Sequence, residues 1–180
     1  MGLKRTVVLT GIMLLAARSS LLAAEALAYK AAPLGTGVSE FLRLNPEFQC
    51  PNKRGVIFEC QSRHSTYADF KAKQVSATFL EGKLSMVEIV IFEGPKGESL
   101  TGSASVIEHA IASRFGEPRK EERTIGSVAE KISLWKSNEG EMQLSQGSNE
   151  TIQFLSIMIS CKDHWQRSVE LRRQSAKGDI

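Results

Sequence analysis

One stretch decides the fold: residues 75–92, with the sequence VSATFLEGKLSMVEIVIF. Its first part, Val75 to Leu80, alternates apolar and polar side chains, as expected of a β-strand with one buried face. Its second part is apolar on both faces, with Val87, Ile89 and Ile91 on one and Leu84, Met86, Val90 and Phe92 on the other. Such a strand is typical of the centre of a sheet, even where its second face is only partly covered. The link Glu81-Gly82-Lys83 between the two parts predicts a hairpin.

Working outward, the same patterns place further strands at 56–60, 131–136, 141–145 and 151–160, joined by links rich in turn residues. A short helix at 40–44, capped by Ser39, ends before a proline. A longer helix combines a capping box, formed by Ser105 and Glu108, with a terminal Gly116. A third helix begins at Asp163 and is expected to fray after Arg173. Residues 61–73 and the charged run 119–123 are expected to be loops.

The resulting order is helix, three strands, helix, three strands, helix. Consecutive strands joined by hairpins make an antiparallel sheet. We therefore predict an α+β domain with a sheet of about six strands, arranged as two three-stranded meanders, and with the helices packed on one face.

The N-terminus has the pattern of a cleaved secretory signal. Lys4 and Arg5 precede an apolar run at 7–17, and the small residues Ala26 and Ala28 suit signal peptidase. A cut after Ala28 removes residues 1–28 and leaves 29–180 as a single domain; a cut two residues earlier is the competing site. The alternative is an uncleaved anchor, but Arg18 interrupts the apolar run short of the roughly 20 residues that a span needs. We expect a periplasmic or secreted protein without a transmembrane span after cleavage.

Composition narrows the class of protein. The chain has 180 residues, a formal charge of +3 and a hydrophobic content of 42%. This length suits one domain, and the apolar content is too high for a disordered chain. A charge of +3 is too small to indicate nucleic-acid binding, and we expect none.

Three cysteines are present, and an exported chain meets an oxidising compartment. Cys50 and Cys60 flank a short polar stretch with turn residues, and we expect them to form a disulfide. The rival pairings use Cys161, which otherwise stays buried as a free thiol. A Cys2His2 zinc site is an alternative, since Cys60 and Cys161 each precede a histidine by three or four residues.

No catalytic, nucleotide-binding or metal motif is present, and we expect no cofactor. Basic residues gather in two segments, and the first also contains aromatic residues. The candidate binding surface from this first segment consists of Lys53, Arg54, Arg63, Tyr67, Phe70 and Lys71. Such a surface suits an envelope protein or an acidic polymer, although scattered solvated charge explains the same residues.

Two local patterns resemble small exported bacterial modules. Gly37-Val38-Ser39 opens a short helix that ends at Asn45-Pro46, and a later helix closes in Arg114-Phe115-Gly116-Glu117-Pro118. These patterns are similar to the tandem α/β modules of β-lactamase inhibitor proteins and of the small lipoprotein of the barrel assembly complex. The resemblance implies a sheet packed on helices that binds another protein. The chain departs from the pattern in having Asn-Pro where those families have Gly-x-Pro, and we transfer no binding residues.

The sequence therefore predicts an exported accessory protein of the cell envelope that acts by binding a protein rather than by catalysis. The alternatives are a binder of a small ligand or an envelope polymer, and an enzyme whose site has no local motif. A deep cleft with convergent polar groups would favour the alternatives, whereas a flat or concave sheet face that is exposed and apolar would favour protein binding.

Overall fold

The computed structural model describes residues 27–53, 55–67, 70–95 and 101–178. Its centre is a seven-stranded antiparallel sheet with the strand order β3-β6-β7-β11-β10-β9-β8. The strands are β3 (Ile57–Ser62), β6 (Gln74–Leu80), β7 (Lys83–Pro95), β8 (Arg119–Ile125), β9 (Val128–Lys136), β10 (Gly140–Ser148) and β11 (Ile152–Cys161). The helices are α1 (Val38–Leu44), α2 (Thr101–Phe115) and α3 (His164–Gly178). The α+β class with an antiparallel sheet is confirmed.

The sheet joins two meanders, one of three strands and one of four, through the pairing of β7 with β11. The prediction of six strands is wrong by one, because the charged run after α2 forms the edge strand β8 rather than a loop. Its charges are compatible with a strand because an edge strand has only one neighbour and two of its charged residues face cross-strand partners of opposite charge. Arg123 Nε lies 2.6 Å from Glu130 Oε2, and Lys131 Nζ lies 3.9 Å from Glu122 Oε1.

The hairpin of β6 and β7 forms as predicted, with a tighter turn. Leu80 pairs with Lys83, so only Glu81 and Gly82 form the turn, and both have positive φ values of 51° and 74°. Such turns match the twist of an antiparallel pair. The register shifts after Thr78, which leaves Ser85 as the extra residue of a β-bulge. The bulge moves Leu84 to the same face as Val87 and Ile89, so its predicted place beside Met86 is wrong.

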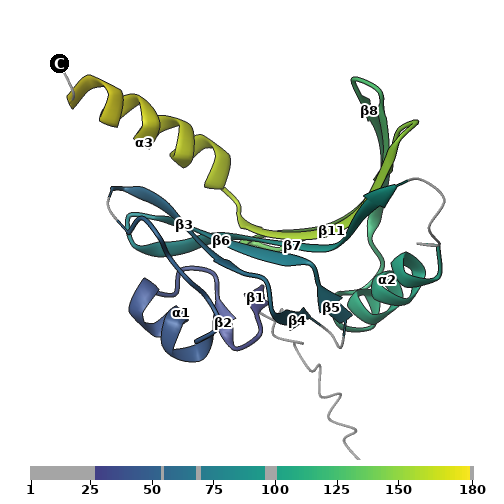
Figure 1. Cartoon of the computed structure of the whole chain (residues 1–180), viewed down its shortest axis with the longest axis horizontal. Helices are drawn as coiled ribbons and strands as arrows, with labels where there is room; N and C mark the ends of the chain where they lie inside the picture. The colour runs from purple at the N-terminus through teal and green to yellow at the C-terminus, as the bar shows by residue number, and fades with distance from the viewer. Residues whose placement is uncertain (1–26, 54, 68–69, 96–100, 179–180) are drawn as a thin grey trace, which may run out of the picture.

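One face of the sheet packs on α1, on α2 and on the N-terminal hairpin of β1 (Ala28–Tyr29) and β2 (Ala32–Pro33) (Figure 1). We call it the core face. Aromatic rings dominate it near α1: the Phe41 and Phe79 ring centroids lie 5.4 Å apart, and Phe58 stacks on Phe79 at 5.1 Å. Burying such rings is the main contribution to the stability of a domain of this size.

The predicted disulfide between Cys50 and Cys60 is confirmed. Cys60 lies in β3 on the core face and is fully buried. The bond therefore fixes the segment after α1 to the first strand of the sheet. Cys161 is a free thiol and is half-buried.

Two expectations about the helices and loops are wrong. The third helix lies on the opposite side of the sheet from the other two, so the helices do not all pack on one face (Figure 1). Its assigned range runs to Gly178, and the expected fraying after Arg173 stays a prediction. The segment expected to be a loop after β3 contains a small hairpin of β4 (Ser65–Tyr67) and β5 (Phe70–Ala72).

Residues 1–26, which include most of the predicted signal, lie outside the described residues. The first described residues are part of the fold: Leu27 and Tyr29 are each 1% exposed, and the Leu34 amide donates a hydrogen bond to the Leu27 carbonyl. Leu27 and Ala28 thus belong to the domain, and a cut after Ala26 is the one that would leave them in place.

Candidate binding surface on the open face of the sheet

The two faces of the central strands differ sharply in exposure. Along β11, Ile157 and Ile159 are 0% exposed on the core face, whereas Met158 between them is only partly buried. Along β7, the side chains of Val87 and Ile89 are likewise fully buried. Side chains in the middle of a seven-stranded sheet stay accessible only where no layer covers them, so this second face is uncovered over its centre.

We call this second face the open face. Its pairing register defines it, since residues opposite each other share a face. Over the central strands it includes Glu59, Gln61, Gln74, Ser76, Thr78, Met86, Glu88, Val90, Gln143, Ser145, Phe154, Ser156, Met158 and Ser160, of which the serines at 76, 145 and 160 are buried.

The open face is concave. The ends of β8 to β11 curve away from α1 and α2, and we call this part the β8–β11 arm (Figure 1). On the same side, α3 rises from the opposite end of the sheet, so the open face lies between the arm and the helix. Within the arm, the Phe154 ring lies flat against Gly147, where an added Cβ would fall 2.3 Å from the ring. Glycine at this position lets the aromatic ring cover the strand beneath it.

The bulge residue Ser85 anchors the start of α3. Its Oγ lies 2.8 Å from Nδ1 of His164, the first residue of the helix, and His164 is only 3% exposed. Burial lowers the pKa of the His164 imidazole, and the positive charge of Arg172 lowers it further. The ring is therefore neutral at neutral pH. Burial raises the pKa of the neighbouring Cys161 thiol, which consequently stays protonated.

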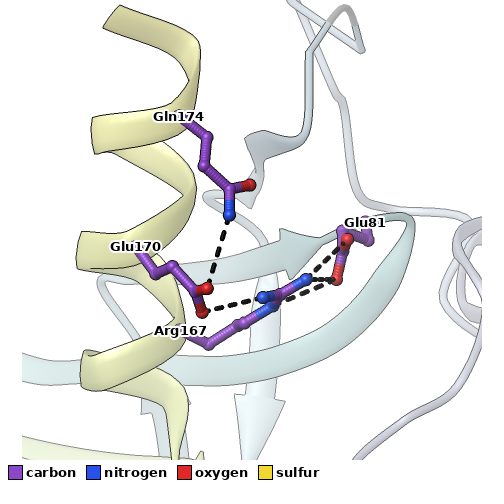
Figure 2. A network of polar contacts seen from close by, with 4 residues as sticks. All are labelled: Glu81, Arg167, Glu170 and Gln174. Atoms are coloured by element: carbon purple, nitrogen blue, oxygen red, sulfur yellow. Dashed lines mark hydrogen bonds and ion pairs between the residues drawn. The ribbon is translucent and has the colours of Figure 1, made fainter. Parts of the chain in front are cut away.

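A charged contact fixes the direction of α3. Arg167 reaches Glu81 in the β6–β7 turn, with Nη2 2.9 Å from both carboxylate oxygens, and Nη1 lies 2.8 Å from Glu170 (Figure 2). Gln174 adds a hydrogen bond to Glu170 at 3.3 Å. These groups are exposed to solvent, so each contact adds little to stability. Together they hold one flank of the helix toward the end of the sheet.

Two carboxylates on the open face have no ion pair within the described part of the chain: Glu59 on β3 and Glu88 on β7. Glu88 is exposed as a residue, but the surrounding protein removes part of the hydration of its carboxylate. This desolvation raises the pKa of Glu88, and the negative charge of Glu59 adds to the shift. The centre of the open face is therefore acidic.

In the sequence-predicted binding surface, the basic residues and the aromatic residues differ in exposure. Lys53, Arg63 and Lys71 are exposed, and Arg54 is outside the described residues. The aromatic pair packs inward instead: Tyr67 stacks on the buried Tyr29 with ring centroids 6.2 Å apart, and Phe70 contacts the core. A binding surface formed by the basic residues stays a prediction. The two aromatic rings pack inward and are not exposed beside them.

The zinc alternative loses a ligand, because the Cys60 sulfur is used in the disulfide. No group of metal-ligating side chains occurs within the described ranges. No helix among them is long and apolar enough to cross a membrane.

Two grooves of about 380 and 400 Å³ adjoin each other at the β8–β11 arm, mainly on its core-face side. The carboxylate of Glu108 lies in the larger groove, where Lys120 and Ser133 donate hydrogen bonds to it. These bonds lower its pKa. A carboxylate held in its charged form lacks the raised pKa that a general acid needs near neutral pH.

Comparison of the chain with family models, with curated proteins and with solved structures gives no match. The residues of the open face were not predicted as a site. The sequence did contain one indication of this site. Residues 84–92 are apolar on both faces, and the second face of such a central strand need only be partly covered. The assignment of function therefore depends on the geometry of this face.

Proposed function

We propose that the protein is an exported, non-catalytic accessory module that binds another protein through the open face. The observation that carries the proposal is the contrast within the central strands, where Met86 and Met158 stay accessible while their neighbours in sequence are fully buried. An uncovered concave face over central strands is typical of a protein-interaction surface. Methionine side chains adapt to irregular partners and are frequent at such surfaces.

The disulfide supports the exported location. A structural disulfide persists in oxidising compartments and is rare in the cytosol. Cys60, fully buried against the core, forms such a bond with Cys50. Together with the N-terminal signal pattern, this bond favours the periplasm or the extracellular space.

Site-specific photocrosslinking tests the proposal. A photoreactive amino acid is placed at Met158, on the open face, and in a control at His109, which is exposed on α2. We expect a discrete adduct with another protein from position 158 in extracts of the source cell, and none from position 109. The adduct should disappear when Thr78, also on the open face, is replaced by tryptophan. Equal adducts from both positions, or none from position 158, would contradict the proposal.

A further inference from the structure

The open face has an apolar wall on one side, provided by α3. His164, Ser168 and Leu171 of this helix are buried against the sheet. Arg167 points from the helix toward the β6–β7 turn at the end of the sheet (Figure 2). At about 100° per residue, positions 165 and 169 lie roughly 160° away from position 167 around the helix axis. The flank with positions 165 and 169 therefore points away from the β6–β7 turn, toward the open face.

Two side chains on this flank are large, apolar and exposed, and the exposed Arg172 lies beside them, about 140° from position 167. Trp165 is 56% exposed and Val169 is 48% exposed. The floor of the open face adds the partly exposed Met86, Val90 and Met158. Exposed tryptophan beside adaptable methionines is the composition of an interaction hot spot, which gains most when apolar side chains of a partner cover it.

The centre of the open face carries an excess of negative charge, while the cationic Arg172 lies on the α3 flank. On the β8–β11 arm the charged groups pair with one another: Arg119 with Glu121, Arg123 with Glu130, and Lys136 with Glu141. Glu59 and Glu88, at the centre, have no such pair within the described residues. A cationic group placed between them would relieve their mutual repulsion and regain part of the lost hydration energy.

The backbone of the central strands limits the form that a partner can take. The N–H and C=O groups of β7 pair with β6 on one side and with β11 on the other. A partner at the centre of the face can therefore bind only through side chains. A helix satisfies its own backbone groups and presents side chains along one face, whereas an added strand needs a free sheet edge.

Resting on the proposed function, we infer that the open face binds a cationic amphipathic helix of the partner protein. The apolar side of that helix packs on Trp165, Val169 and the methionine floor. Its Lys or Arg side chains reach Glu59 and Glu88.

Two synthetic helical peptides of about 18 residues test this inference. They share one leucine face and differ only in carrying Lys or Glu at every polar position. Binding is followed by the emission of Trp165, which is expected to shift to shorter wavelength as the peptide covers it. Trp165→Phe should abolish the shift, since the other tryptophan, Trp135, is 5% exposed and lies on the core face.

We expect the Lys peptide to bind at least tenfold more tightly than the Glu peptide. The double variant Glu59→Gln/Glu88→Gln should reduce this ratio to near one. The control is Glu122→Gln, which removes one negative charge from the core-face side of β8, where the glutamate side chain is 77% exposed. It should leave the ratio within about twofold. A comparable thermal midpoint for all variants separates loss of binding from loss of folding.

Other outcomes overturn the inference. If the Glu peptide binds equally well and shifts the emission of Trp165, the open face does not select cationic groups and the inference fails. The proposed function is unaffected by that result. If neither peptide shifts the emission of Trp165, the inference fails. The crosslinking experiment at position 158 then tests the proposed function separately. A concentration-dependent dimer that disappears in the double variant would mean that a second copy occupies the face, and would also overturn the inference.

Discussion

Alanine substitutions at Ile157 and at Met158 distinguish the two faces of the sheet within one strand. Ile157 is fully buried and lies opposite the buried residues Ile89 and Leu144. Removing its three outer carbons costs about 2.4 kcal/mol at about 0.8 kcal/mol per group. The cavity left behind brings the expected loss to about 3–4 kcal/mol. Met158 is only partly buried, and its truncation should cost about 1 kcal/mol or less.

Equilibrium urea unfolding, followed by far-UV circular dichroism under non-reducing conditions, measures both losses. We expect the free energies of unfolding of the two variants to differ by about 2–3 kcal/mol, with unchanged m values. Both substitutions lie in the same central strand, so general effects of alanine on strand formation largely cancel. Equal losses at the two positions would refute the reasoning, because they would mean that the supposed open face is covered.

Three further predictions follow from the disulfide, the buried histidine and the N-terminus. Cys50→Ser should lower the free energy of unfolding by about 2–3 kcal/mol, as measured by urea unfolding, whereas Cys161→Ser should change it little; equal effects would contradict the assigned pairing. Stability should fall as the pH drops below about 6.5, because the unfolded state takes up a proton that the buried His164 resists. The Tm of the His164→Gln variant should lose this dependence over that interval; an unchanged profile would exclude His164 as its source. If the proposed export occurs, N-terminal sequencing of the processed protein should begin at Leu27, and a start at Tyr29 would show that the packing of Leu27 is dispensable.

The sequence predicted most of the fold, and its errors have physical causes. The strands at 75–80 and 151–160 were recognisable because their apolar patterns are long and regular. The edge strand β8 was missed because its five charged residues, at 119–123, look like a solvated loop and are explained only by partners on β9 and α2. Local patterns do not contain such long-range pairings.

The bulge at Ser85 explains two other errors. A strict alternation assigns Leu84 to the face of Met86, and only the pairing with β6 reveals the extra residue. The same residue anchors His164 and thereby holds α3 on the open side of the sheet. Nothing near position 85 in the sequence predicts that contact, because its partner is 79 residues away. The positions of α3 and of the β8–β11 arm beside the open face therefore could not be predicted from the sequence.

The central claim is that one face of the central strands is free for a partner. Methyl NMR with a soluble gadolinium chelate tests it most directly, since the chelate broadens only the signals of accessible methyl groups. We expect strong broadening for Met86 and Met158 and almost none for Ile157 and Ile159. Equal protection of all four methyl signals would contradict it, because the open face would then be covered in the free protein.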